Sequence, residues 1–442
     1  MLIHNITMSA NYSQINPETH SYHQQDVPSC LLSNNSAQSI KSRNRIIQLS
    51  STSSTQSSGG LILFNIPPSN YSITKGSALL RFRVTVTGTT LGTTDVNAIS
   101  FQGFGNIAAA APYVLQYGNA YSIFNRMTLF ASNSSIIEQV NYLNDNENLM
   151  LMHNSNPTFL TADGASMLGI GTAFAYSPGG NAGTSATLDL CVPLPLSFFN
   201  STTQNVPLYL MSSPMTLQID LATVARSLFR GANAVITDYS VSNCFLMYQA
   251  VELPNAFVEA QRMSVKSSPY IMNLTNSMSV QVPMSVLTNY TLGINASSVR
   301  AVFLLPLATT EYVVTVSNSY AKDTNAGFTC SLFVDGNIVN SALFDNSPVI
   351  FSQLKQALHH SVQTGVLFPS VSNSTTFDTK YFSIGWDLSN FDESATIFAG
   401  TPATQLSIQL NNFVSSAKLV TIIVLYDTLV AIEADGSVST KR

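Results

Sequence analysis

The sequence predicts an all-β protein made of two β-domains in tandem, and three observations support this prediction. Apolar and polar residues alternate with a period of two in several short runs, the pattern of half-buried strands. Prolines stand at the ends of these runs and not in their middles, as strands require. Finally, the segment from Pro214 to Pro254 has an echo near the C-terminus. The 442 residues are enough to bury two separate cores.

The echo consists of three matching phrases in the same order. The last pair aligns Tyr248 with Tyr426 and places a strand-like run at the end of each half. The shared order indicates a duplicated β-domain, which requires the insert 222–234 to be a loop or helix outside the sheets. In chain order, the pairs are LPLS (194–197) with WDLS (386–389), TLQIDL (216–221) with QLSIQL (405–410), and FLMYQAVEL (245–253) with IVLYDTLVA (423–431).

We divide the chain into four parts. Residues 1–60 form a flexible polar arm that ends in the low-complexity run STSSTQSSGG. Residues 61–253 form the first β-domain, and residues 269–442 form the second. Between them, residues 254–268 switch to a helix-like pattern and form the linker.

Local patterns place several elements of the first domain. ALLRFRVTVT (78–87) alternates strictly and predicts a half-buried strand. NAYSIFNRMTLF (119–130) predicts a short helical turn that runs into a strand, and IIEQV (136–140) predicts a second short strand. LNDNENLMLM (143–152) predicts a helix, and the Gly- and Ala-rich residues 153–183 predict a long loop.

Two further signals belong to the second domain. Asp335 and Gly336 form a pair typical of a hairpin turn. Ser347 caps a predicted helix that has Pro348 at its first position. The apolar residues that recur at helical spacing after this cap are Ile350, Phe351, Leu354, Ala357 and Leu358.

The composition is poor in charge. Charged residues make up 9% of the chain, whereas globular chains average about 25%. This suits a protein whose surface is covered by neighbours, but a β-rich extracellular domain rich in Ser, Thr and Asn has the same composition. The net charge of −5 argues against a surface that coats nucleic acid. Neither a run of about 18 apolar residues nor a signal-peptide pattern is present, so we expect a soluble, unsecreted chain.

The cysteines and the basic residues of the arm give weak signals. Cys30, Cys191, Cys244 and Cys330 lie far apart without metal-ligand spacing, and the last three lie in apolar strand-like runs. We therefore expect buried free thiols and not disulfides or metal ligands. A separate basic cluster in the arm suits either an anionic partner or a solvated patch; its residues are Lys41, Arg43 and Arg45.

Few residues of the chain are candidates for catalysis or metal binding. His359 and His360 are adjacent on a predicted helix and point about 100° apart, so they do not easily ligate one metal. The sequence GIG, starting at Gly169, lacks the third glycine of a dinucleotide fingerprint. No P-loop, HExxH or GxSxG motif occurs.

One segment near the C-terminus contains three carboxylates close together. Asp387, Asp392 and Glu393 resemble a glycosidase-like carboxylate pair or a cation site, but a solvated loop is the better explanation of them. Trp386 would stack on a sugar if exposed, but its place in an alternating apolar run predicts a core residue. We therefore predict no catalytic, cofactor-binding or metal-ligating residue.

At the level of whole segments, the chain resembles the double jelly-roll major capsid proteins. Residues 119–150 resemble the segment in which a short helix leads into a hairpin with an Ile-Glu pair and an Asn-rich helical turn. GSALLRFRVTVTG (76–88) resembles their opening strand, and VPLPLSFF (192–199) resembles their late first-barrel segment. FSIGWDLSNF (382–391), followed by QLSIQL, resembles the closing strands of their second barrel. The resemblance is to the virophage, polinton-like and small DNA phage branches, and the loop at 153–183 departs from their pattern.

The resemblance implies two tandem eight-stranded jelly-roll barrels. It also implies a homotrimer that forms pseudo-hexameric capsomers in an icosahedral virion shell, beside neighbouring capsomers and penton and minor capsid proteins. The arm would reach an internal membrane or the genome through Lys41, Arg43 and Arg45. The alternatives are a β-sandwich attachment or glycan-binding protein, and a carbohydrate-active enzyme that uses Asp387 or Glu393.

Overall fold

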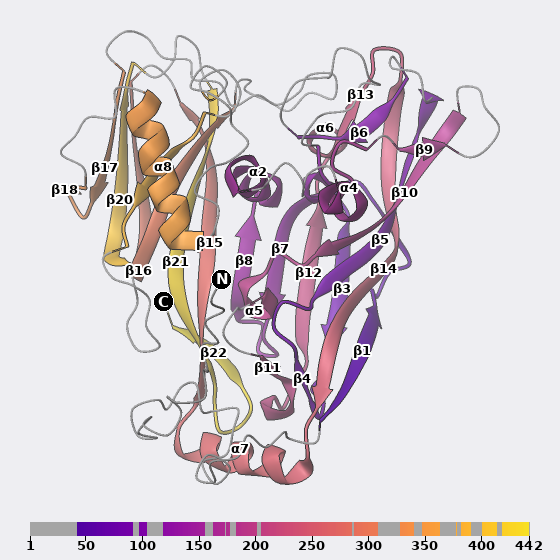
Figure 1. The fold of residues 1–442 in the computed structure, drawn as a ribbon, viewed down its shortest axis with the longest axis vertical. Helices are drawn as coiled ribbons and strands as arrows, with labels where there is room; N and C mark the ends of the chain where they lie inside the picture. The colour runs from indigo at the N-terminus through magenta and orange to yellow at the C-terminus, as the bar shows by residue number, and fades with distance from the viewer. Residues whose placement is uncertain are drawn as a thin grey trace, which may run out of the picture.

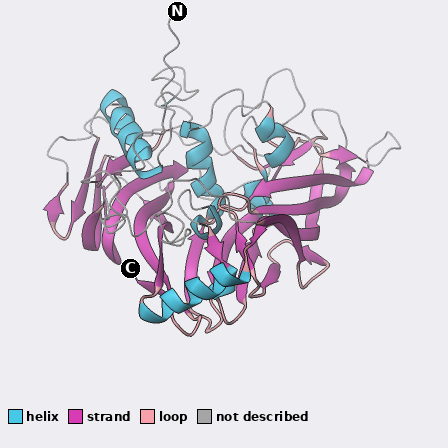
Figure 2. Ribbon diagram, turned by 60° about the horizontal axis from the view of Figure 1, so that its bottom comes forward, coloured by secondary structure: helices cyan, strands magenta, loops and turns pink. Residues whose placement is uncertain are grey.

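Two β-sandwiches stand side by side in the computed structural model, and a helix at one end joins them (Figure 1). Viewed from that end, the strands of both sandwiches lie above the joining helix (Figure 2). The structure describes residues 42–91, 97–103, 118–154, 162–172, 174–176, 183–200, 205–284, 287–307, 328–339, 347–362, 377, 382–389, 400–412 and 418–441.

The first sandwich has eight principal strands in two sheets. Numbered in chain order, the first, eighth, third and sixth strands form one sheet, and the second, seventh, fourth and fifth form the other. This antiparallel order is that of a jelly roll. The strands are β1 (Arg43–Ser50), β3 (Leu61–Ile66), β5 (Leu79–Leu91), β7 (Phe124–Phe130), β8 (Ile136–Asn141), β10 (Gly183–Pro193), β12 (Met215–Leu221) and β14 (Val235–Glu252).

Short elements fill the connections of the first jelly roll. The extra strands are β2 (Thr55–Ser57), β4 (Tyr71–Ile73), β6 (Ile99–Phe101), β9 (Ala175–Tyr176), β11 (Val206–Pro207) and β13 (Leu228–Arg230). The helices are η2 (Ala120–Ile123), α2 (Leu143–Asn154), α4 (Asp163–Leu168), α5 (Ser197–Asn200), η3 (Leu208–Leu210) and α6 (Val224–Ser227).

The second sandwich repeats the same strand order. Its strand β16 supplies both the second and the third strand, because residues 287–293 pair with β20 and residues 299–307 pair with β21. The pairing register shifts between these two parts, where the chain passes from one sheet to the other. The strands are β15 (Tyr270–Met284), β16 (Leu287–Leu307), β17 (Thr329–Val334), β18 (Asn337–Ile338), β19 (Ile384–Asp387), β20 (Thr401–Asn411) and β21 (Lys418–Ile432), with the added β22 (Val438–Lys441).

The shared order supports the duplication seen in the sequence. TLQIDL and QLSIQL lie in β12 and β20, the seventh strands, and the two tyrosine-containing phrases lie in β14 and β21, the eighth. Tyr248 pairs with Ile47 of the first strand, and Tyr426 pairs with Asn276. The insert 222–234 holds α6 and β13. Among the described strands β13 pairs only with β6, in a separate two-stranded sheet, so the insert lies outside the two main sheets.

The first pair of the repeat, LPLS with WDLS, is offset from the predicted alignment. On the third strands, Leu80 pairs with Val192 and Val302 pairs with Trp386. Leu80 and Val302 occupy equivalent positions opposite the eighth strands. Trp386 therefore corresponds to Val192 and not to Leu194, a correction of two residues.

The predicted arm of residues 1–60 is too long. Its last part contains β1, which pairs along its whole length with β14, and β2, which also pairs with β14. The strand predicted to open the domain, β5, is consequently the third. The alternation in β1 is weak, since only Ile47 and Leu49 pack against the core and most other residues are exposed. The hydrogen bonds to β14, and not a strong apolar pattern, make it a strand.

The helix that joins the two jelly rolls is α7 (Asn255–Ser267), which agrees with the linker predicted at 254–268. Its buried side is formed by Phe257, Val258 and Val265. Arg262 donates two hydrogen bonds to the carbonyl of Tyr209, at 2.9 and 3.1 Å from its Nη2 and Nε. These bonds fasten the linker to the base of the first jelly roll.

Most of the predicted local elements are present. Asp335 and Gly336 both have positive φ, 48° and 83°, as the hairpin turn between β17 and β18 requires. The helix predicted at Ser347 is α8 (Ser347–Val362), which packs against β19. The loop predicted at 153–183 is partly wrong, because α4 and β9 lie within it.

A buried ion pair explains why the apolar run of β21 is interrupted. Asp427 is 2% exposed, and its Oδ1 lies 2.5 Å from Nε of Arg300. Ser298 donates to the other carboxylate oxygen at 2.5 Å. Arg300 occupies the register shift between Val299 and Ala301, which brings its side chain to Asp427. Removing one member of such a pair leaves an uncompensated buried charge.

Trp386 lies in the core, as the alternating pattern predicted, with 1% of its surface exposed. We expect Trp386→Ala to lower the free energy of unfolding by about 3–5 kcal/mol, because it removes a large buried side chain. Chemical denaturation followed by circular dichroism would measure the loss. Val349→Ala on α8, where the side chain is 37% exposed, is the control and should change stability by less than about 0.5 kcal/mol. Equal effects of the two substitutions would contradict the core assignment.

Candidate functional site

The contact between the two jelly rolls is the most elaborate polar site that the structure describes. Strand β8 of the first jelly roll lies beside β15 of the second, and α2 lies above them in the same seam (Figure 1). Helix α2 is polar yet largely enclosed, because both jelly rolls pack around it. Its buried polar residues are Asn144, Asp145, Asn146, Asn148 and His153.

Asp145 is the centre of a network that joins the two halves. Its Oδ2 accepts hydrogen bonds from Nε2 of Gln281 at 2.7 Å and from the hydroxyl of Thr421 at 2.8 Å, both in the second jelly roll. Arg226 of the first jelly roll donates to the Gln281 side-chain oxygen and, at 3.1 Å, to Asn125. The guanidinium also lies 5.1 Å from the ring centre of Tyr142.

Two more contacts cross the seam beside this network. The Asn146 amide donates to the hydroxyl of Ser279 at 2.9 Å. The Ser197 hydroxyl donates to the backbone carbonyl of Thr275 at 2.5 Å. The backbone N–H groups of Ser197 and Phe198 donate in turn to the two oxygens of Glu138, at 2.7 and 2.9 Å. Glu138 therefore positions the residue that reaches across.

At the end of α2, His153 contacts the second jelly roll. Its Nε2 lies 2.7 Å from the hydroxyl of Ser383, and Lys355 of α8 donates to its backbone carbonyl at 2.5 Å. Burial and the nearby Lys355 charge lower the pKa of His153 well below its ordinary value, so the ring is neutral near pH 7. Burial also lowers the pKa of Lys355 to about 7.

Two carboxyl groups at the seam have raised pKa values. Burial raises the pKa of Glu138 to about 7, although its two backbone hydrogen bonds act in the opposite direction. Burial alone raises the pKa of Glu147, on α2, to about 7. A carboxyl group in such surroundings favours its neutral form.

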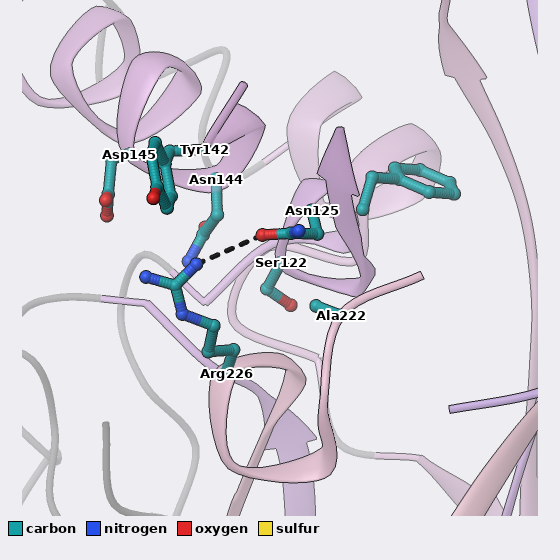
Figure 3. Close-up of a pocket in the computed structure, with 8 residues that line it drawn as sticks. Ser122, Asn125, Tyr142, Asn144, Asp145, Ala222 and Arg226 are labelled. Atoms are coloured by element: carbon teal, nitrogen blue, oxygen red, sulfur yellow. Dashed lines mark hydrogen bonds between the residues drawn. The ribbon is translucent and has the colours of Figure 1, made fainter. Parts of the chain in front are cut away.

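A small pocket adjoins the network (Figure 3). In Figure 3, the side chain of Arg226 points toward Asn125, and the side chains of Asn144 and Asp145 extend from α2 above Arg226. Its free volume of about 10 Å³ is the room that one water molecule needs, far below the several hundred Å³ of ligand sites. It is lined by Ser122, Phe124, Asn125, Tyr142, Asn144, Asp145, Ala222 and Arg226. This pocket therefore does not suit a sugar or a cofactor.

The residues considered for catalysis do not form a site in the described part of the chain. Asp387 ends β19, where its Oδ1 accepts a hydrogen bond from the Ser389 N–H at 3.0 Å. Asp392, Glu393 and the side chains of His359 and His360 lie outside the described residues. Because Trp386 is buried, the glycan-binding alternative loses the aromatic residue proposed to stack on a sugar.

The GIG sequence has a structural role at the end of α4. Gly169 adopts a φ of 65° and caps the helix in the left-handed conformation. A side chain there would come within 2.9 Å of the Phe101 ring. No group of three metal-ligating side chains occurs within the described ranges.

The remaining candidate residues have simple surroundings. Arg45 pairs with Glu252 at 3.0 Å, and Arg43 is exposed beside it, whereas Lys41 lies outside the described residues. Cys244 and Cys330 are buried free thiols, as predicted, and Cys191 is free but only half-buried. Cys30 lies outside the described residues. No described helix is long and apolar enough to cross a membrane.

The seam itself was not predicted. Asp145 and Glu138 stood in predicted elements, but nothing in their spacing connected them to Gln281, Thr421 or Thr275. The available signal was the composition of α2, which has four Asn residues and one Asp among twelve residues and no clear apolar stripe. Such a helix must either face water or lie against polar partners.

Comparisons with known structures agree with this architecture. The chain is similar to a chain of the PBCV-1 virus capsid, with a TM-score of 0.57 and 11% identity, covering 92% of this chain and 98% of that one. For the Faustovirus major capsid protein, the TM-score is 0.61 at 9% identity, over 89% and 91% of the two chains. For a chain of the Sputnik virophage, the TM-score is 0.54 at 13% identity, over 92% and 89%.

At these identities the likeness establishes the fold, a double jelly roll, over nearly the whole chain. No protein-family model and no curated protein matches the sequence.

We expect Asp145→Ala to lower the free energy of unfolding by about 1–3 kcal/mol, because the donors of Gln281 and Thr421 lose their shared acceptor inside the seam. Thermal unfolding would measure the change. Asp163→Ala, at an exposed position of α4, is the matched control and should cost less than about 1 kcal/mol. If Asp145→Ala were as stable as the control, the hydrogen bonds of Asp145 would not stabilise the seam.

Glu147 predicts a pH dependence of stability. Its pKa is about 7 in the folded protein against an ordinary value of 4.5, so its stabilising contribution is complete below pH 4.5 and is lost as the pH rises through 7. Glu147→Gln should therefore leave the melting temperature unchanged at pH 4.5 and raise it at pH 8. The corresponding gain in the free energy of unfolding at pH 8 is up to about 3 kcal/mol. The exposed Glu259→Gln is the control. A pH-independent difference would argue against the raised pKa of Glu147.

Proposed function

We propose that this protein is the major capsid protein of a virus and that it trimerises into pseudo-hexameric capsomers of an icosahedral shell. The observation that carries the proposal is the double jelly roll, which 89–92% of this chain shares with a PBCV-1 capsid chain, the Faustovirus major capsid protein and a chain of the Sputnik virophage. Fold alone does not define function, so the proposal needs support from the chain itself. On this proposal the protein resides in the virion and acts without catalysis.

The composition supports a role in a close-packed shell. Charged residues are only 9% of the chain, and large permanent interfaces are depleted in charge at their centres. The net charge of −5 suits a protein that surrounds a genome without binding it over a large surface. The partners on this proposal are other copies of the chain, neighbouring capsomers, and penton and minor capsid proteins.

The proposal also includes contact of the N-terminal arm with an internal membrane or with the genome. Of the three basic residues predicted to make it, Arg45 is engaged by Glu252 and by the Tyr71 ring, 5.7 Å from its guanidinium carbon. Lys41 and Arg43 would have to provide such a contact with little help from Arg45.

The proposal predicts a stable trimer. Light scattering of the purified protein should give a mass of three times 47.6 kDa, and electron microscopy should show trimers or hexagonal sheets. Six jelly rolls around one axis are the physical reason for the hexagonal outline. A monomer at high protein concentration, with no ordered assembly in micrographs, would overturn the proposal.

A further inference from the structure

Two sheet edges at opposite sides of the molecule are uncovered within the described residues. Strand β1 lies at the outer side of the first jelly roll, and β18 lies at the outer side of the second (Figure 1). Each has a single paired neighbour among the described strands, β14 and β17 respectively. Both edges carry exposed apolar residues: Ile46 is 71% exposed, Ile338 50% and Val339 37%. Exposed strand edges invite pairing or packing with another chain.

The internal repeat shows what covers the equivalent edge in the second jelly roll. Strand β15 corresponds to β1, because both are first strands that pair with the tyrosine-containing eighth strand. With Tyr248 aligned to Tyr426, Ile46 corresponds to Thr275, and Ser50 corresponds to Ser279. These residues lie on the outward-facing row of their strands.

In the second jelly roll, the first jelly roll covers this row. Ser279 is 2% exposed and bonds to Asn146, and the Thr275 carbonyl accepts the hydrogen bond from Ser197. In the first jelly roll the same row is open, and Ile46 and Ser50 are exposed.

The fifth strands of the two jelly rolls, β8 and β18, also occupy equivalent positions. Strand β8, which lies against β15, is the fifth strand of the first jelly roll and the end of its sheet. Strand β18 is the fifth strand of the second jelly roll and also the end of its sheet. Within one chain, a fifth strand (β8) therefore contacts a first strand (β15). The other fifth strand, β18, and the other first strand, β1, have no such contact among the described residues, so two copies of the chain could form a second one.

We propose that the β18 edge of one copy packs against β1 of the next copy, with Ile338 and Val339 meeting Ile46. This inference rests on the proposed function and specifies its copy-to-copy contact. The contact is head to tail, and repeated head-to-tail contacts with the right rotation close into a ring.

The apolar character of these edges has a physical reason. The seam inside the chain joins covalently linked halves, so hydrogen bonds suffice to orient them. A contact between separate chains must overcome the loss of translational and rotational freedom, and burial of apolar surface provides a larger driving force. Three of the eight exposed large apolar side chains among the described residues lie at these two edges, and Ile46 is the most exposed of the eight.

The test places a charge at each edge. Ile46→Asp and Ile338→Asp should each convert the trimer into a monomer in light scattering, since a buried unpaired carboxylate opposes the contact. Met263→Asp is the control, because Met263 is 64% exposed and lies on α7, outside both edge strands; this variant should remain a trimer. Circular dichroism and thermal unfolding would show that the monomeric variants are folded.

Mixing the two variants tests the head-to-tail geometry. The Ile46→Asp chain keeps an intact β18 edge, and the Ile338→Asp chain keeps an intact β1 edge. Native mass spectrometry of the mixture should therefore detect a complex with one copy of each, at concentrations where each variant alone is monomeric.

Other outcomes would overturn the inference in distinguishable ways. A wild-type trimer with both variants still trimeric would refute this contact and leave the proposed function standing. Loss of the trimer in the Ile46 variant alone, or no mixed complex, would also exclude it, since the first result indicates a symmetric contact of β1 with itself. A monomeric wild-type protein would overturn the proposed function as well.

Discussion

The carboxylate of Asp145 determines how the two jelly rolls sit against each other. It is 1% exposed and accepts hydrogen bonds from two strands of the other jelly roll, β15 and β21. Apolar surfaces tolerate sliding, whereas a buried carboxylate keeps its donors only in one arrangement. The polar groups of helix α2, which carries Asp145, therefore orient two domains whose own cores are mainly apolar.

This arrangement gives a repeated architecture two kinds of contact. Within the chain, β8 of the first jelly roll lies against β15 of the second, and hydroxyl, amide and carboxylate groups of α2 and α5 make the polar contacts across this seam. At the free ends, the equivalent strands present isoleucine and valine side chains. The outward rows of the two first strands thus differ, since Ile46 of β1 is exposed and Ser279 of β15 is buried in the seam.

The seam also concentrates groups whose charge depends on pH. Glu138, Glu147 and Lys355 have pKa values of about 7, and His153 stays neutral there. Burial is the first cause in each case. A seam built from such groups responds to protonation more than the apolar cores do, because the cores contain few titratable residues.

The sequence by itself determined the two β-domains, the order of their closing strands, the linker helix and the core position of Trp386. These features depend on local periodicity, which is visible in a single chain. Only the tertiary structure decided that residues 43–50 are a strand, because β1 has few inward apolar residues and depends on its pairing with β14.

The tertiary structure also decided the role of α2, since the partners of Asp145 lie up to 276 residues away in the sequence. Polar residues that satisfy one another at such separations leave no periodic signal, and the hydrogen bonds form only once both jelly rolls have folded.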